Sequence, residues 1–437
     1  MTTPAPRRVS PAALPGLLLA VFIVPISIAG VATALPAIAH DLGSAPTPLQ
    51  WVVNGFNVAF AVFTLVWGVV SDRVGHKVTL VIGLVGSISS LALSALAPTL
   101  LTLDLARVLC GLFAAAIGTS TPAIISGAYE GPSRTRNFAL FGTALGIGLA
   151  VGPTISGSLT AAFGWRGVFA AFAALMTVSL ALSFFVPRTG HERHPGTKIL
   201  DLGILRNARF MSAVLMPVVQ AFGFITLLTY LPVALSAVYG LGAGRLAVTM
   251  IALTGPTLIG PALGARLVAR VRKITVHGMF YTSIALMLLG NTGMLLIAGP
   301  APLWTLIIPM VLLGFSFGLP LGLIDGAALN AVPAENSGSA SGLLQFARLG
   351  SEAVVIAVYA AVITALIAAR IDDPALADDV ASGRPGHADD YIPAFVTGQI
   401  ALLTAVLIGL AATVLLHRAV RRADRAATAG TTTAGAP

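Results

Sequence analysis

Apolar residues run in long blocks along this chain, and short polar segments separate them. A bilayer-spanning helix needs about 20 mainly apolar residues to cross a hydrocarbon core of about 30 Å. Twelve blocks have about this length, and they cover residues 14–38, 49–71, 78–97, 100–128, 138–163, 168–186, 210–239, 246–269, 276–298, 303–332, 342–367 and 393–417. None alternates polar and apolar residues as a barrel strand does. The pattern therefore predicts an all-α membrane protein with 12 transmembrane helices.

The polar segment after the sixth block divides the blocks into two equal sets. It covers residues 188–209, is basic and contains a Pro-Gly pair. We predict an N-terminal six-helix half at 1–187, this segment as a cytoplasmic linker, and a C-terminal six-helix half at 210–417. A cytoplasmic tail at 418–437, rich in Ala, Thr and Gly toward its end, is expected to be disordered. Paired halves are typical of secondary transporters, which move one half against the other around a central site.

The placement of lysine and arginine predicts how the helices are oriented. With both termini in the cytoplasm, 19 of the 25 basic residues fall in cytoplasmic segments, in agreement with the positive-inside rule. Contact with anionic lipid headgroups then accounts for the net charge of +9, so we expect a lipid bilayer and no nucleic acid as a partner. The predicted location is the cytoplasmic (inner) membrane.

The loop between the second and third blocks combines glycines with charges. Its key residues are Gly68, Asp72, Arg73, Gly75 and Lys77. A glycine permits close helix approach, an aspartate at a helix end can pair with an arginine or a neighbouring helix N-terminus, and basic side chains face lipid headgroups. The loop resembles the GxxxDRxGRRxxL loop of the major facilitator superfamily. That resemblance implies the major facilitator fold and a role as a gate latch.

The resemblance of this loop has two departures. His76 stands where the superfamily usually has arginine. The corresponding loop of the second half keeps Arg266 and Arg270 but has Ala269 where an acid would lie. We therefore expect the acid-dependent latch mainly in the first half.

The fourth block contains charges inside a predicted span. Asp104 and Arg107 lie in a stretch that resembles the RxxQG motif of the superfamily's drug:proton antiporters, with Cys110 in place of the glutamine. A buried arginine costs at least about 2.5 kcal/mol on insertion scales, so such residues indicate a function by default. The three-residue spacing also allows a purely structural ion pair.

The fifth block contains a run of small residues. It resembles the GxxxGPxxGG antiporter motif found in exporters of the superfamily, and the matching positions are Gly148, Gly152, Pro153 and Gly157. Plain helix packing is the alternative, because small residues four apart are common in membrane helices. Two shorter fragments, at 51–56 and 164–169, are similar to the same branch.

Proton coupling cannot be inherited directly from this branch, whose members tend to carry an aspartate in the first span. Alignment on the Ala-Leu-Pro at 34–36 puts Ser27 at that position. Arg348 and Glu352 lie four apart on one helix face, where burial favours a neutral acid and a nearby arginine favours a charged one. Glu352 is the first candidate proton carrier, Asp325 the second, and Asp104 with Arg107 the third. A fixed ion pair is the alternative for Glu352 and Asp325.

Neutral polar residues inside the spans are the candidate substrate contacts: Asn54, Asn57, Gln220, Tyr230 and Gln345. No catalytic set, metal-ligand spacing or phosphate loop is recognisable, so we expect no enzyme, no cofactor and no metal site. We predict a monomeric secondary active transporter that exports small amphipathic or cationic organic compounds in exchange for protons. The alternatives are a transporter of a specific metabolite, uncoupled or importing, and a non-transport membrane sensor or enzyme.

Overall fold

The computed structural model describes residues 10–42, 46–187, 202–271, 274–299 and 302–433. Within these ranges every regular element is a helix, which confirms the predicted all-α class. The helices form two compact units: unit 1 comprises Met1–Ile204 and Ala328–Leu349, and unit 2 comprises Leu205–Ala327 and Gly350–Pro437. Residues 328–349 thus group with the N-terminal part of the chain, and the six-plus-six division stays a prediction. Most of the expected linker, residues 188–201, lies outside the described residues.

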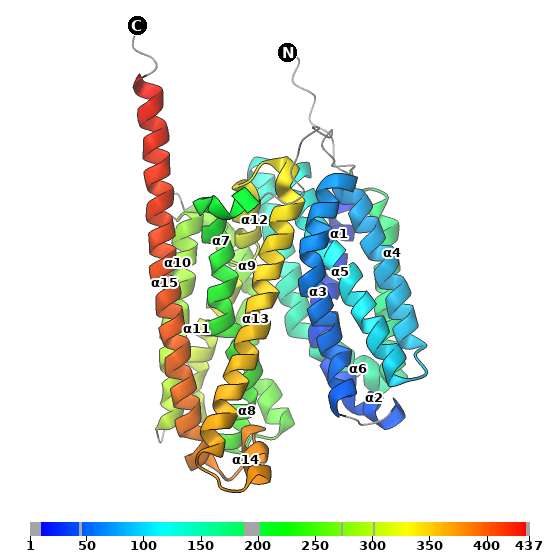
Figure 1. Ribbon diagram of the computed structural model, residues 1–437, viewed down its shortest axis with the longest axis vertical. Coiled ribbons are helices and arrows are strands. Elements are labelled where there is room, and N and C mark those ends of the chain that lie inside the picture. The colour runs from blue at the N-terminus through cyan, green and yellow to red at the C-terminus, as the bar shows by residue number, and fades with distance from the viewer. Residues whose placement is uncertain (1–9, 43–45, 188–201, 272–273, 300–301, 434–437) are drawn as a thin grey trace. The chain divides into compact units, whose positions relative to one another are not determined.

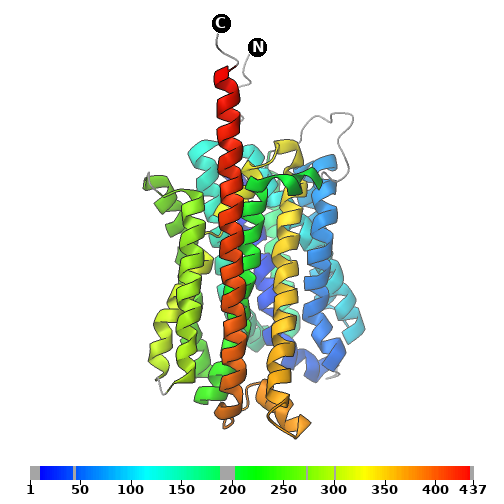
Figure 2. The ribbon, with the colours of Figure 1, turned by 60° about the vertical axis from the view of Figure 1, so that its left-hand side comes forward.

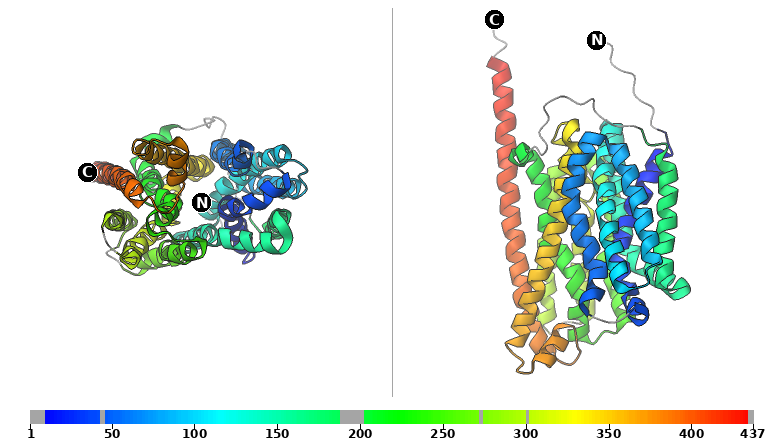
Figure 3. Two further views of the ribbon diagram at one scale, coloured as in Figure 1. Left: turned by 90° about the horizontal axis from the view of Figure 1, so that it is seen from below. Right: turned by 45° about the vertical axis from the view of Figure 1, so that its right-hand side comes forward.

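Unit 1 is built from long apolar helices that pack in pairs. They are α1 (Ala13–Ala29), η1 (Val31–Ala34), α2 (Leu35–Leu42), α3 (Pro46–Val74), α4 (His76–Ala95), α5 (Leu100–Ala128), α6 (Gly131–Ser183) and η6 (Ala334–Asn336), with the first residues of α13 (Ser337–Ala368). α3 packs on α5, α1 packs on α6, and α4 contacts both α5 and α6 (Figures 1 and 3). These contacts hold the candidate site residues of the first half in one body.

The helix α6 is broken near its middle. Gly164 has φ 70° and ψ 174°, a conformation that glycine adopts without the steric cost of a Cβ. The break divides the 53-residue helix into two arms, which correspond to the predicted fifth and sixth spans.

Unit 2 contains the remaining helices, several of which are interrupted. They are the last two residues of η2 (Leu202–Arg206), α7 (Ala208–Gln220), the π-helical turn η3 (Ala221–Ile225), α8 (Thr226–Tyr239), α9 (Ala243–Arg270), α10 (Val276–Met294), η4 (Leu295–Ala298), η5 (Leu303–Leu306), α11 (Ile307–Gly318), most of α12 (Leu323–Asn330), the rest of α13, α14 (Pro374–Ala381) and α15 (Ala388–Thr433). α11 packs between α9 and α10, and α15 packs on α7 and α10. Among the described residues, the core of unit 2 is therefore built from packed helices.

Among the described residues, ten or eleven helices could cross a membrane, close to the twelve predicted spans. Ten helices are long and apolar enough to cross a membrane, and α1 with η1 and α2 adds an eleventh if this bent pair is one span. One of the ten is α6, whose two arms each match a predicted span.

The C-terminal helix α15 runs past the predicted end of the last span. The residues from 418 on are predicted to be disordered, but α15 continues to Thr433, beyond the ends of its neighbours α7 and α10 (Figure 2). A helix already nucleated by the span gains one hydrogen bond for each residue added, and Ala and Arg are good helix formers.

Candidate functional site

Asp72 lies in the last turn of α3 and binds the start of α13. Its Oδ1 accepts a hydrogen bond from the backbone N–H of Gly338 (2.6 Å), and its Oδ2 accepts from the backbone N–H of Ser339 (2.7 Å) and from the Ser339 hydroxyl (2.5 Å). The first N–H groups of a helix have no intrahelical acceptor and form the positive end of its dipole. The Asp72 carboxylate, on α3, therefore caps the N-terminus of α13. A neighbouring helix N-terminus was one of the two partners that the sequence allowed for this aspartate.

Two glycines permit this contact. A Cβ at Gly68 would lie 2.8 Å from the carbonyl oxygen of Gly338, and a Cβ at Gly338 would lie 2.5 Å from Asp72 Oδ1. Real Cβ atoms do not approach so closely, so the crossing of α3 and α13 requires glycine at both positions. Gly75, with φ 96°, makes the turn from α3 into α4.

The basic residues of the loop have separate roles. Lys77 Nζ donates to the carbonyl oxygens of Phe184 (3.1 Å) and Val186 (2.6 Å), just after the second arm of α6. A cation there is favoured by the helix dipole. Arg73 is exposed, as expected of a side chain that faces headgroups. The predicted latch residues thus surround one corner of unit 1.

Arg107 is fully buried in unit 1 and bonds to uncharged groups. Its Nε donates to the Val52 carbonyl (2.9 Å), while Nη1 and Nη2 donate to the Ser27 hydroxyl (2.9 Å) and the Ser27 carbonyl (3.0 Å). The guanidinium also lies 4.5 Å from the ring centre of Phe56 and 5.7 Å from that of Phe169. Ser27, the residue aligned with the missing aspartate, thus contacts Arg107 through both its hydroxyl and its carbonyl.

Asp104 is one turn before Arg107 on α5, but the structural ion pair that the spacing allowed does not form. The Asp104 Oδ1 atom is buried and has no hydrogen-bond partner. Arg107 instead extends toward α3 and the C-terminal part of α1, where three neutral acceptors are available. A shared helix face allows a contact without requiring it.

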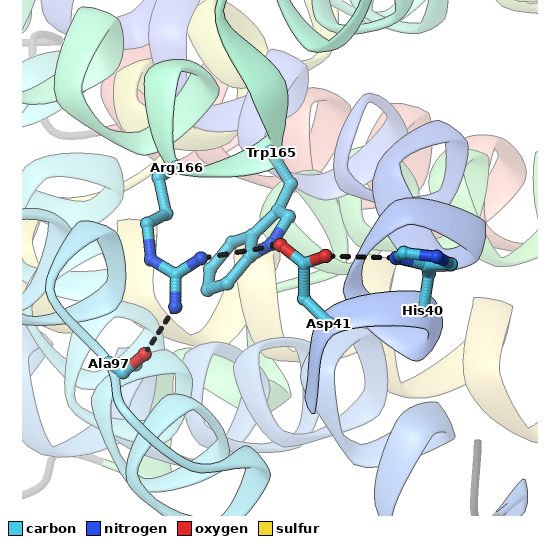
Figure 4. Close-up of polar contacts among 5 residues, drawn as sticks. All are labelled: His40, Asp41, Ala97, Trp165 and Arg166. Atoms are coloured by element: carbon cyan, nitrogen blue, oxygen red, sulfur yellow. Dashed lines mark hydrogen bonds and ion pairs between the residues drawn. The ribbon is translucent and has the colours of Figure 1, made fainter. Parts of the chain in front are cut away.

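The second arm of α6 begins with Trp165 and Arg166, which form hydrogen bonds with α2 and with the segment after α4 (Figure 4). Asp41, at the end of α2, accepts hydrogen bonds from Trp165 Nε1 (2.9 Å) and Arg166 Nη1 (3.4 Å), and Arg166 Nη2 donates to the Ala97 carbonyl (3.1 Å). Our sequence analysis noted the fragment at 164–169 but missed Asp41. An acid at the end of the first span was the available signal.

The small residues of the fifth span pack against the first span. A Cβ at Gly148 would lie 2.5 Å from the Phe22 carbonyl oxygen, and a Cβ at Gly30 would lie 2.8 Å from the Gly152 carbonyl oxygen. Pro153 is exposed, and a Cβ at Gly157 would meet only Thr33 Oγ1, at 4.0 Å. The motif is thus a close helix interface on one side only.

The other candidate proton carriers lie in different parts of the chain. Asp325, in unit 2, is 1% exposed and occupies the first turn of α12, after a break in which Gly322 has φ 82°. Glu352, also in unit 2, is half-buried on α13. Arg348, in unit 1, donates to Gln345 Oε1.

The five neutral substrate candidates do not fall within one unit. Asn54 is exposed, Asn57 has a buried Oδ1 without a partner, and Gln345 accepts from Arg348; all three belong to unit 1. In unit 2, Gln220 donates to the Phe317 carbonyl (3.1 Å), and the ring of Tyr230 lies 5.1 Å from that of Tyr359.

Unit 2 also holds a polar network that our sequence analysis missed. Asn291 Nδ2 donates to the carbonyl of Gly223 (2.9 Å), within the π-helical turn, and Gln399 Nε2 donates to Asn291 Oδ1 (2.6 Å). π-helical turns inside α-helices frequently occur at functional sites. The signal was one asparagine and one glutamine inside otherwise apolar blocks.

Within the part of the chain that the structure describes, no three His, Cys, Asp or Glu side chains cluster so that they could hold a metal ion.

Comparisons with known proteins agree with the helical architecture. A sequence model of the Major Facilitator Superfamily matches residues 17–371. The chain is 26% identical over 379 residues to the "Probable actinorhodin transporter" of Streptomyces coelicolor, covering 71% of this chain and 65% of that protein. It is 25% identical over 430 residues to the "Multidrug efflux pump LfrA" of Mycolicibacterium smegmatis, covering 86% and 84%. In structure it is similar to the proton:xylose symporter XylE, with a TM-score of 0.70 at 14% identity over 93% and 95% of the two chains.

Proposed function

This chain belongs to the Major Facilitator Superfamily, and from that premise we propose that it is a proton-coupled exporter of small amphipathic or cationic organic compounds. The observation that carries the proposal is the similarity to an efflux pump over 86% of this chain. The Gly148 and Gly30 contacts between the first and fifth spans support it, because the glycine motif at this interface resembles that of exporters. We place the protein in the cytoplasmic membrane as a monomer with both termini inside.

Proton exchange in this proposal does not use the Arg107 position. A carrier must gain and lose a proton during the cycle, and the serine hydroxyl that Arg107 contacts does not titrate near neutral pH. We assign the proton to Glu352, with Asp325 as the second candidate. Glu352 is half-buried one turn after Arg348, and a carboxyl on which partial burial and a nearby cation act in opposite directions can change protonation between two states.

One observation favours a second candidate function. Arg107 binds the neutral Ser27, which cannot carry a proton near neutral pH. If neither Glu352 nor Asp325 carries a proton either, the best alternative is an uncoupled transporter of a specific metabolite.

Proteoliposomes test both functions. Ethidium, a cationic amphipathic dye, is loaded inside vesicles with and without an imposed pH gradient, and its movement is followed by fluorescence. Gradient-stimulated movement supports the proposal, and movement unaffected by the gradient supports the uncoupled alternative.

The carrier assignment is tested with Glu352→Gln and Asp325→Asn. We expect Glu352→Gln to abolish gradient-driven transport but to preserve dye binding and dye-for-dye exchange, because a permanently neutral side chain imitates the protonated form. Unchanged gradient-driven transport in Glu352→Gln, with loss in Asp325→Asn, would move the assignment to Asp325.

A further inference from the structure

His76 lies between two serines at the corner where Asp72 meets α13. Its Nδ1 is 2.8 Å from the Ser71 hydroxyl, and its Nε2 is 3.1 Å from the Ser337 hydroxyl. The three side chains are buried, with His76 6% exposed and Ser71 fully covered. Ser337 directly precedes Gly338 and Ser339, whose N–H groups bind Asp72. His76 and Asp72 together therefore form hydrogen bonds with three consecutive residues at the start of α13.

The hydrogen-bond partners place a hydrogen on one nitrogen of the ring. The Ser337 hydroxyl donates its one hydrogen to the Ala334 carbonyl (2.8 Å), so it can only accept from His76, and Nε2 must carry a hydrogen. In the neutral ring Nδ1 is then an acceptor, which the Ser71 hydroxyl satisfies. A neutral His76 with its hydrogen on Nε2 thus fits both serines.

The two bonds have different consequences. The bond to Ser71 lies within the α3–α4 corner, whereas the bond to Ser337 reaches α13. Asp72 can bind the first N–H groups of α13 only if the helix start lies at that position, and the Nε2 bond is one contact that joins it to this corner.

We propose that His76 is a positioning residue of the latch, and that its Nε2–H bond to Ser337 fixes the start of α13 so that Asp72 can bind Gly338 and Ser339. The proposal rests on the proposed function, because it assigns His76 a part in gating by the transporter. It concerns a residue at which this chain departs from the arginine of the resembling loop.

Two amide substitutions separate the two bonds. In His76→Gln the longer side-chain amide would reach the place of Nε2 and keep a donor toward Ser337. In His76→Asn the shorter amide would occupy the place of Nδ1 and keep only the Ser71 contact. A histidine that merely fills space would be replaced about equally well by either amide.

Amide hydrogen exchange, measured on the full chain in lipid nanodiscs, reports whether Asp72 is bound to the start of α13. The N–H groups of Gly338 and Ser339 have no intrahelical acceptor, so their protection reports the bonds to Asp72. We expect His76→Asn to exchange these amides about tenfold faster than wild type and His76→Gln to stay within about twofold, in line with the loss of a buried hydrogen bond. Ser337→Ala should match His76→Asn, whereas Ser341→Ala, one turn further along α13, should match wild type.

Equal exchange rates in His76→Asn and His76→Gln would overturn the proposal. If His76→Asn does not fold, Ser337→Ala decides, and wild-type exchange in that variant would overturn the proposal too. The readout needs no transport, so a failure of the exporter assignment leaves this test intact, and a failure here leaves the exporter assignment intact.

Discussion

The loop after α3 and the loop after α9 occupy corresponding places in the two predicted halves, but the charges at the two helix C-termini are stabilised differently. In the first, Asp72 lies in the last turn of α3, where the helix dipole disfavours a negative charge by about 0.3–1 kcal/mol. Three hydrogen bonds from the start of α13 offset this cost. In the second, Ala269 and Arg270 end α9, both are exposed, and the cation suits the dipole without needing another helix.

The difference agrees with the prediction that an acid-dependent latch lies in the first loop. The first loop is unfavourable alone and becomes favourable only when it meets another helix, which is what a contact that opens and closes requires. The second loop is stable by itself, and its glycine has a packing role: a Cβ at Gly264 would overlap the carbonyl oxygen of Leu319 within unit 2. We therefore propose that the first loop makes a conditional contact, whereas Gly264 of the second loop packs within a core.

The largest effect is expected for Asp72→Asn. Charge-assisted hydrogen bonds contribute about 1.5–3 kcal/mol, and the new amide N–H₂ would face the donors of Gly338 or Ser339. We expect dye efflux to fall at least about tenfold in proteoliposomes with equal amounts of folded protein. Asp378→Asn, at an exposed position on α14, is the matched control. Normal efflux in a correctly folded Asp72→Asn would reject the latch.

The sequence predicted the loop itself but not its partner. Hydropathy identifies spans because each residue's transfer free energy from water to lipid is local, and the latch motif is short and continuous. Gly338 and Ser339 lie 266 and 267 residues from Asp72, and small residues do not specify which helix they meet. The same limit hid Asp41, whose partners Trp165 and Arg166 are 124 and 125 residues away.

The pattern of apolar blocks also did not predict where helices break or end. The tail after 418 ends in a run of Thr, Ala and Gly, but its helix continues from a span through a stretch of Ala and Arg. Ser27 is different, because its alignment placed it in the first span and the structure puts it against Arg107. That residue was predictable because the pattern that located it, Ala34 to Pro36, lies close by in the chain.

A steric change should weaken the latch without removing its charge. In Gly338→Ala the new Cβ would lie 2.5 Å from Asp72 Oδ1 and 2.7 Å from the Gly68 carbonyl oxygen, so α13 must shift away. We expect efflux to fall about fivefold, less than in Asp72→Asn, because a small shift lengthens the hydrogen bonds without eliminating them.

Gly350→Ala is the control for this change on the same helix. A Cβ at Gly350 would meet nothing within 4 Å, and alanine stabilises a helix by about 0.5–1 kcal/mol relative to glycine. Its efflux should equal that of the wild type. Equal losses in the two variants would show that the rigidity of α13, and not contact with Asp72, controls transport.

Gly264→Ala should affect stability more than transport. Overpacking a tight helix contact costs about 1–3 kcal/mol, so we expect a melting temperature several degrees lower in detergent. Efflux for each folded molecule should stay within about twofold of the wild type, because this glycine packs a core and holds no conditional contact. A large loss of efflux with an unchanged melting temperature would mean that the second loop also gates.

The smallest effect is expected for Ala269→Asp, which restores an acid at the corresponding place of the second loop. The new carboxylate would lie at an exposed helix C-terminus, at a cost of about 0.3–1 kcal/mol, and Arg266, three residues earlier, would offset about 0.2–0.5 kcal/mol of it. We therefore expect unchanged efflux and melting temperature in the single variant, and no rescue when it is combined with Asp72→Asn. If the added acid restored efflux to Asp72→Asn, the charge of the loop would matter more than the helix it meets, and the distinction between a conditional contact and a core would fail.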